Sequence, residues 1–155
     1  QMRGGEIYAR SDTGRWAGYE MKGGKIVAEG DVGPGACKNM TGGECYIGGS
    51  TEDALGMGMK DGKIVIDGFG GYQVGRGMQG GEIHLMDTAG SHVGLQMKGG
   101  TIRAAGMVGP YAGEDMTGGD IYLKGGGESP LGKIKGGHIH LPESGIIGWL
   151  RRYFL

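Results

Sequence analysis

Residues 21–43 read MKGGKIVAEGDVGPGACKNMTGG, a stretch that opens and closes on the motif Met-x-Gly-Gly with a spacing of 19 residues. The spacing holds along the chain, except that Asp61 and Gly62 replace one pair and that the last pair follows after 18 residues, with one deletion within residues 129–133. The glycine pairs are Gly4-Gly5, Gly23-Gly24, Gly42-Gly43, Gly80-Gly81, Gly99-Gly100, Gly118-Gly119 and Gly136-Gly137. Eight copies of one unit therefore span residues 1–141, which is the signature of a repeat architecture.

Apolar residues alternate with other residues after each glycine pair, which is the period of a β-strand with one buried face. The expected core ladder stands two residues after the pairs, at Ile7, Ile26, Cys45, Ile64, Ile83, Ile102, Ile121 and Ile139. A second apolar column follows at Ala9, Ala28, Ile47, Ile66, Leu85, Ala104, Leu123 and Leu141. A methionine column precedes the pairs, and its period favours packing in the core or at a corner over a metal-binding stripe. Its members are Met2, Met21, Met40, Met59, Met78, Met97 and Met116, with Ile134 in the last copy.

A third apolar column lies on the return path of each unit, at Ala17, Ala36, Leu55, Val74, Val93, Ala112 and Leu131. The expected turn glycines follow it directly, at Gly18, Gly56, Gly75, Gly94, Gly113 and Gly132, with Cys37 in the remaining place. A unit with only four or five strand residues cannot bury its own face, so it must stack on its neighbours. The sequence predicts an all-β fold, a single-stranded β-helix of about eight 19-residue coils. Coils about 4.8 Å apart would form a rod roughly 38 Å long.

Charges alternate at the outward position of successive units, in the order Glu6, Lys25, Glu44, Lys63 and Glu82. Residues 19 apart should lie directly beside one another if the coils stack. Neighbouring opposite charges stabilise paired strands by about 0.2–1 kcal/mol each. The alternation therefore tests whether the coils stack in register, and it does not indicate a function.

The composition excludes several classes of function. Glycine accounts for 40 of the 155 residues, yet the net charge is only −1, which leaves no electrostatic footprint for nucleic acid or an anionic membrane. Cys37 and Cys45 are not arranged as C-x-x-C, so we expect two reduced, partly buried thiols and no zinc or iron–sulfur site. No apolar run reaches the roughly 18–20 residues that a membrane span needs, and we expect no signal peptide before the repeats. We expect a cytoplasmic protein.

The histidines are the residues that most resemble candidates for chemistry. His138 and His140 alternate on the outward face of the last strand, and His84 shares a column with His140. Glu143 is the one acid near them in the sequence, so exposed strand histidines are favoured over a metal site. His92 stands in a turn where the sequence shows no triad with a serine and an acid. We therefore expect no catalytic, cofactor-binding or metal-binding residue on this chain.

The two ends of the chain differ in character. Residues 142–155 leave the repeat and are rich in aromatic and aliphatic side chains, which predicts a cap over the open end of the solenoid or a partner contact. The candidate contact residues are Trp149, Arg151, Arg152, Tyr153 and Phe154. Two arginines within ten residues are too few to predict membrane binding. The N-terminal end starts inside the repeat, so we expect further sequence before it or another polypeptide over it.

The repeat, in stretches such as GDVGPGACKNMTGG (residues 30–43) and YAGEDMTGG (residues 111–119), resembles the glycine-repeat domain known as GXGXG. That domain occurs as the C subunit of formylmethanofuran dehydrogenase, in the related formyltransferase/hydrolase complex and in the glutamate synthase large subunit. The likeness covers residues 2–141, and its regular coils are most similar to the C subunit. It implies a right-handed β-helix. The family's N-terminal region has no counterpart here.

The resemblance also implies a function. In that family the C subunit is similar to a scaffold, and the tungsten or molybdenum pterin, the iron–sulfur clusters and the dinuclear metal site belong to other subunits. We expect a non-catalytic subunit of a hetero-oligomeric oxidoreductase complex of one-carbon metabolism and methanogenesis. Two alternatives remain open: a glutamate synthase-type or formyltransferase/hydrolase domain, and a solenoid acyltransferase that uses a turn histidine as base. A unit of 19 residues disfavours the acyltransferase, whose coils usually follow six-residue units.

Overall fold

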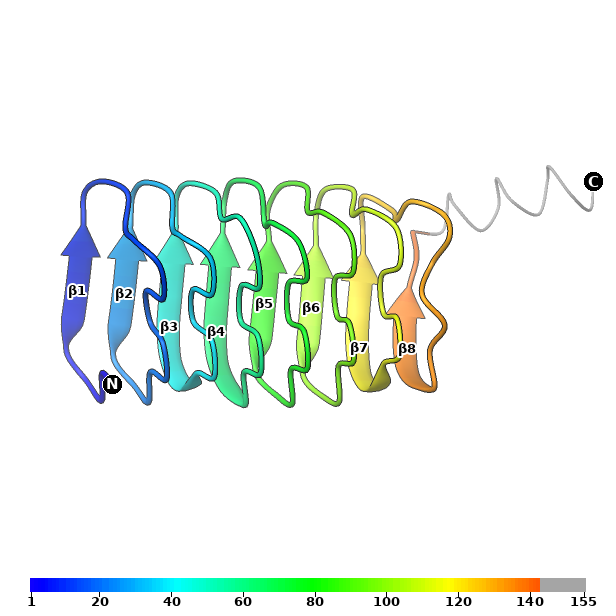
Figure 1. Ribbon diagram of the computed structural model, residues 1–155, viewed down its shortest axis with the longest axis horizontal. Helices are drawn as coiled ribbons and strands as arrows, with labels where there is room; N and C mark the ends of the chain where they lie inside the picture. Colours follow the sequence, from blue (N-terminus) through cyan, green and yellow to red (C-terminus); the bar gives the residue numbers. More distant parts are fainter. Residues whose placement is uncertain (143–155) are drawn as a thin grey trace, which may run out of the picture.

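The computed structural model describes residues 1–142, and within this range the chain is an all-β solenoid whose eight strands form one parallel sheet in the order β1 to β8 (Figure 1). The strands are β1 (Glu6–Ala9), β2 (Lys25–Ala28), β3 (Thr41–Ile47), β4 (Asp61–Ile66), β5 (Glu82–Leu85), β6 (Thr101–Ala104), β7 (Thr117–Leu123) and β8 (Gly136–His140). In Figure 1 the strands run upward behind the descending return segments while the chain advances from β1 to β8, which is a right-handed path. Eight strands delimit about seven complete turns, one fewer than the count of repeat copies.

Each strand pairs with the next copy of itself, in the register that the 19-residue period predicts. Ile7 lies beside Ile26, and Ile26 lies beside Cys45. The last junction keeps this pairing across the deletion, since Ile121 lies beside Ile139. Because side chains alternate along a strand, one column of each copy faces the core and the next faces outward.

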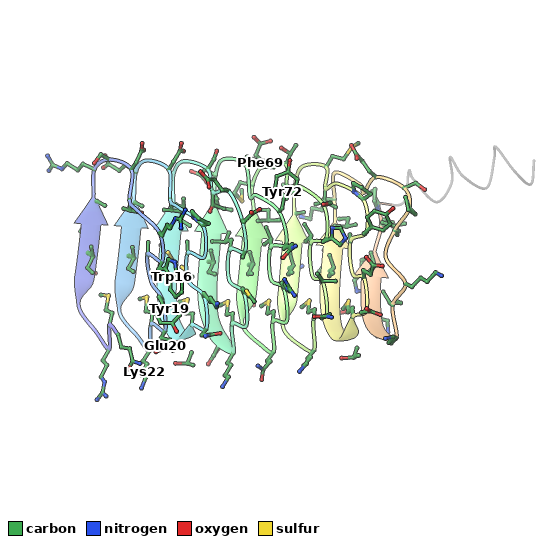
Figure 2. All side chains as sticks on the ribbon, in the orientation of Figure 1. Trp16, Tyr19, Glu20, Lys22, Phe69 and Tyr72 are labelled. Carbon is green, nitrogen blue, oxygen red and sulfur yellow. The ribbon has the colours of Figure 1, made fainter. Side chains whose placement is uncertain are left out.

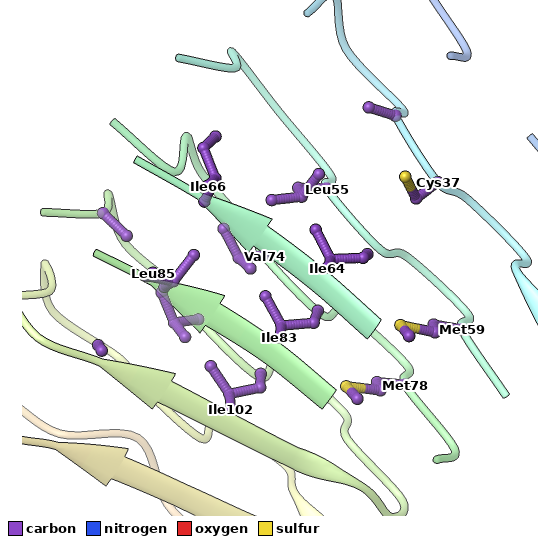
Figure 3. Packing of buried hydrophobic residues seen from close by; sticks show 14 of the residues in the cluster. Cys37, Leu55, Met59, Ile64, Ile66, Val74, Met78, Ile83, Leu85 and Ile102 are labelled. Carbon is purple, nitrogen blue, oxygen red and sulfur yellow. The ribbon is translucent and has the colours of Figure 1, made fainter. Parts of the chain in front are cut away.

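The core consists of stacked columns of side chains from the strands, such as Ile64 and Ile66, and from the return path, such as Leu55 (Figure 3). From Ile26 to Ile121 the core ladder is at most 6 % exposed, and the methionines from Met21 to Met116 are fully buried. Ile7 is 50 % exposed because no described coil precedes β1, and Ile139 in the last coil is partly buried. Burial of each ladder residue therefore depends on having a coil on both sides.

The methionine column explains why the second glycine of each pair is needed. Gly43 has a φ of +91°, and a Cβ added there would lie 2.7 Å from Cε of Met21 and 2.7 Å from the carbonyl oxygen of Gly24. The same methionine contact recurs at Gly24, Gly62, Gly81, Gly100, Gly119 and Gly137. Each methionine thus occupies the space that glycine leaves open in the following coil.

The return path turns through left-handed residues in every coil. The predicted turn glycines from Gly18 to Gly113 have φ of +64° to +73°, whereas Gly132, in the shortened coil, lies outside this region. Residues directly before the third apolar column are also left-handed, at Trp16, Ala54, Gln73, His92 and Tyr111. The positive φ of His92 therefore recurs at the same position in other coils and is not specific to this histidine.

The two cysteines lie deeper than the sequence suggests. Cys37 and Cys45 are free thiols, and both are buried in the core. A hydrogen bond with the Cys45 thiol, together with burial, raises the pKa of Cys37 well above its usual value. Both therefore act as small apolar side chains here.

Candidate functional site

The outward face of the sheet is a regular surface that runs along the solenoid, and it carries two columns of side chains. The first column is Glu6, Lys25, Glu44, Lys63, Glu82, Thr101, Asp120 and His138. The second is Tyr8, Val27, Tyr46, Val65, His84, Arg103, Tyr122 and His140. Charged groups thus lie next to a stripe of aromatic and aliphatic groups along the whole sheet.

The charged column stacks as the sequence predicts, but its carboxylates turn toward the second column. Among residues 1–142, no ion pair within 4.0 Å joins the alternating glutamates and lysines. Instead, the Tyr46 hydroxyl donates to Glu44 over 3.1 Å, and Lys25 Nζ lies 5.0 Å from the centre of the Tyr46 ring. The favourable contacts of this face therefore run between the two columns, along one strand for Glu44 and Tyr46 and diagonally for Lys25 and Tyr46.

The sheet face ends in a stack of rings over β6 to β8. The Arg103 guanidinium lies 4.3 Å from the centre of the Tyr122 ring, which stacks on His140 with centroids 4.2 Å apart and an interplanar angle of 6°. Asp120 accepts a hydrogen bond from Nε2 of His140 at 2.9 Å, and Nδ1 of His138 lies 3.5 Å from the same oxygen. Because His140 donates to it, and because His138 and Arg103 lie nearby, the pKa of Asp120 is below its ordinary value.

Asp120 corrects the sequence interpretation of this histidine pair. The sequence offered only Glu143 as a nearby acid, and that residue lies outside residues 1–142. Asp120 sits 20 residues before His140 but on the adjacent strand, whereas Glu82, which lies 3.0 Å from His84, is two residues before it on the same strand. In the part of the chain that the structure describes, no three such groups are arranged to hold a metal ion. The histidines pair with acids on an exposed face.

His92 has two polar neighbours that the sequence did not indicate. The Ser91 hydroxyl lies 3.0 Å from Nδ1, and a carboxylate oxygen of Glu114, one coil further on, lies 3.4 Å from Nε2. Tyr111 stacks against the ring with centroids 5.1 Å apart. A serine, a histidine and an acid thus meet, contrary to the expectation of no triad.

Two backbone N–H groups beside His92 are occupied within the coil stack. A hydrolytic site needs hydrogen-bond donors, from backbone N–H groups or side chains, that are free to stabilise an oxyanion. Here the His92 N–H donates to the carbonyl of Pro110 at 3.0 Å, and the Gly109 N–H donates to that of Ala89 at 3.0 Å. These two N–H groups are therefore not free to act as oxyanion donors.

A groove lies at the corner that follows the C-terminal ends of the strands. It has a volume of about 510 Å³ and is lined by Phe69, Tyr72, Thr88, Ala89, Gly90, Ser91, Met107, Val108, Gly109, Pro110 and Glu128. Figure 2 labels Phe69 and Tyr72 at this corner, where their rings pack edge to face with centroids 5.9 Å apart. Sequence reasoning missed this groove, although the run of glycines at positions 71, 90 and 109 in one column was a visible signal.

The candidate contact residues Trp149, Arg151, Arg152, Tyr153 and Phe154 lie outside the described residues. No family model matches the chain, and no curated protein is significantly similar to it. The likeness to the GXGXG domain therefore rests on the repeat pattern alone. Within residues 1–142 the structure holds no helix long and apolar enough to cross a membrane.

Proposed function

We propose that this chain is a non-catalytic scaffold subunit of a formylmethanofuran dehydrogenase-type oxidoreductase complex, located in the cytoplasm, and that it positions the subunits that carry the chemistry. The observation that carries the proposal is the continuous parallel sheet of eight strands in register, with exposed side chains along its outer face. A stack with a narrow, fully packed core is a rigid body. Such a body suits the task of holding other polypeptides in a constant arrangement.

The sheet face has the chemistry of a protein interface. Tyrosine and arginine are enriched at such interfaces because they bury large areas and also form hydrogen bonds. Tyr8 is 64 % exposed, and Tyr46, Arg103 and Tyr122 follow it along one column. Charged partners beside them would orient a docked subunit, since complementary charges fix register.

The resemblance supplies the identity of the complex. In the family that the repeat resembles, pterin, iron–sulfur and dinuclear metal cofactors belong to other subunits, and this proposal assigns them to the partners. A glutamate synthase-type domain or a formyltransferase/hydrolase subunit is the alternative, because it would use the same coils.

Affinity isolation of the chain from its native source, followed by mass spectrometry, tests the proposal. We expect partners with pterin-binding and amidohydrolase-like sequences. Glutaminase and flavin subunits would identify the glutamate synthase alternative. Recovery as a free monomer with transferase activity would refute the scaffold function.

A surface variant tests the docking face. Tyr46→Asp places a charge in the middle of the aromatic stripe, so we expect it to reduce recovery of the partners at temperatures well below its melting temperature, which the lost contacts with Glu44 and Lys25 should lower. Gln96→Asp, on an exposed turn of the return path, is the matched control and should leave recovery unchanged. Equal recovery with both variants would exclude the sheet face as the contact.

A further inference from the structure

The groove at the strand-end corner is built by one column of the repeat. This column reads Glu52, Gly71, Gly90, Gly109 and Glu128 in successive coils. The Tyr72 ring folds over Gly90, where an added Cβ would collide with it, and a Cβ on Gly109 would lie 2.8 Å from the backbone nitrogen of Ser91. Gly90 and Gly109 therefore form the floor of a trough that runs along the axis, and Glu128 lies at the end nearer the C-terminus.

The walls of the trough are apolar and exposed. Tyr72 is 51 % exposed and Met107 is 50 % exposed, although both are large side chains that a globular protein usually covers. The buried side chains of Ala89 and Val108 continue the apolar surface inward. Contiguous exposed apolar surface of this kind marks a binding groove.

The corner around the trough, which forms its rim, is acidic, and Glu128 is the carboxylate of this corner that lines the groove itself. The corner segments that follow β4 to β7 cover residues 67–72, 86–91, 105–110 and 124–130, and they carry Asp67, Asp87 and Glu128 against Lys124. Each of these carboxylates is exposed. A segment that combines apolar anchors with positive charge would match both the walls and the rim.

We infer that the chain's own C-terminal segment, residues 143–155, is the occupant of this groove. Its sequence, ESGIIGWLRRYFL, joins seven large apolar side chains to Arg151 and Arg152. Trp149 and its apolar neighbours supply anchors for the walls, and the two guanidinium groups match the carboxylates of the rim. The inference concerns the chain itself and does not depend on the identity of any partner.

The segment starts close enough to reach the groove. Pro142 follows β8 at the position that Lys124 holds after β7, so it stands at the same corner, one coil beyond Glu128. Phe69, at the far end, lies four coil spacings away, or roughly 19 Å. Thirteen residues span about 43 Å when extended and about 20 Å as a helix. Either length covers the trough.

Trp149 provides a direct readout in the full-length chain. Trp16 is the other tryptophan, and it lies on a coil near the N-terminal end, away from Phe69 and Tyr72 (Figure 2). With Trp16→Phe as background, we expect Trp149 emission to be blue-shifted and protected from acrylamide, relative to a synthetic peptide of residues 143–155.

Variants in the groove test whether the protection of Trp149 comes from docking in the trough. Met107→Lys removes an apolar wall and adds a repulsive charge, and we expect it to lower the ratio of docked to free segment about tenfold, which equals about 1.4 kcal/mol. Met86→Lys is the matched control, because Met86 is 55 % exposed on the same corner but does not line the groove. The charge reversal Arg151→Glu with Arg152→Glu should release the segment as Met107→Lys does.

Three results would overturn the inference. Trp149 emission equal to that of the free peptide would show that the segment is not docked. Protection that survives Met107→Lys would place it elsewhere, for example over the end of the solenoid. Protection that falls on dilution, with a doubled mass by light scattering, would make a second copy the source of the segment.

Discussion

At the scale of single residues, glycine content follows from close contact between coils and not from a need for mobility. The second glycine of each pair combines a left-handed φ with contact to a methionine methyl and to a backbone oxygen. Two independent constraints therefore act on one position. On the return path, Gly35 and Gly77 have a positive φ and nothing within 4 Å of an added Cβ, so they carry the conformational constraint alone.

Gly81→Ala and Gly77→Ala separate these two constraints. At Gly81 an added Cβ lies 2.7 Å from Cε of Met59, whereas at Gly77 nothing lies within 4 Å, and both have positive φ. Gly77→Ala should lower the free energy of unfolding by about 1–2 kcal/mol, because alanine is strained in the left-handed conformation. Gly81→Ala should lower the free energy of unfolding by about a further 1–3 kcal/mol, because the added methyl group overpacks the core. Urea unfolding measures both, and equal losses would mean that the methionine contact is unimportant.

Asp120 should make the stability of the C-terminal coils depend on pH. Its pKa is lowered in the folded state, so its contribution is complete above the ordinary value of 3.8 and is lost as the pH falls through the lowered one. We expect Asp120→Asn to lower the melting temperature at about pH 5 and the deficit to shrink toward about pH 2. Asp87→Asn, an exposed carboxylate at the groove corner, is the control. A deficit that is constant with pH would contradict the assigned contact.

At the scale of the strand, stacking turns a sequence period into pairs of neighbours. Glu6, Lys25 and Glu44 become adjacent in space because β1, β2 and β3 are in register. The pairing is confirmed, while the direct ion pairs that the ladder suggests are replaced by contacts with tyrosine. Long side chains on an exposed face can contact several partners, and these contacts have similar energies.

Lys25→Glu should weaken the N-terminal coils. The change places three glutamates side by side and removes the ammonium group near the Tyr46 ring. With two like-charge neighbours at about 0.2–1 kcal/mol each, we expect a loss of about 0.4–2 kcal/mol. The loss should be larger at low salt than at high salt and smaller for Lys25→Gln. A melting temperature that is unchanged at low salt would argue against direct stacking.

At the scale of the whole molecule, stability is a sum of contacts between adjacent coils. Every long-range strand pair joins consecutive strands, so no contact bridges distant coils of the sheet. The end coils have one neighbour among the described residues, as the exposure of Ile7 shows. Unfolding should therefore start at an end.

Ile83→Ala and Ile7→Ala measure this gradient. Ile83 is 0 % exposed and Ile7 is 50 % exposed at the same position of the repeat. Ile83→Ala should cost about 2–5 kcal/mol, as for other buried isoleucines, and Ile7→Ala clearly less. In hydrogen exchange, amides of β4 and β5 should be the slowest and those of β1 among the fastest. Uniform protection along the chain would instead indicate a single cooperative unit.

The regular part of the fold was predictable because each residue's environment repeats with the sequence. The ladder from Ile26 to Ile121 is buried as the alternation indicates, and the register across the deletion before Gly136 is kept. The surface was less predictable. Two groups of contacts were not visible in the repeat, because their columns differ from coil to coil. One is the contact between Asp120 and His140, and the other places Ser91 and Glu114 around His92.

By itself, the sequence determined the coil, its length and the in-register stacking of its copies, because apolar side chains that recur every 19 residues are buried together when successive copies lie side by side. The tertiary structure decided which exposed side chains meet. It selected tyrosine over lysine as the partner of Glu44, brought Asp120 to two histidines, and opened a trough over Gly90 and Gly109. These outcomes depend on the direction of individual side chains and on the space around them in one coil. A pattern shared by eight copies carries no information about either.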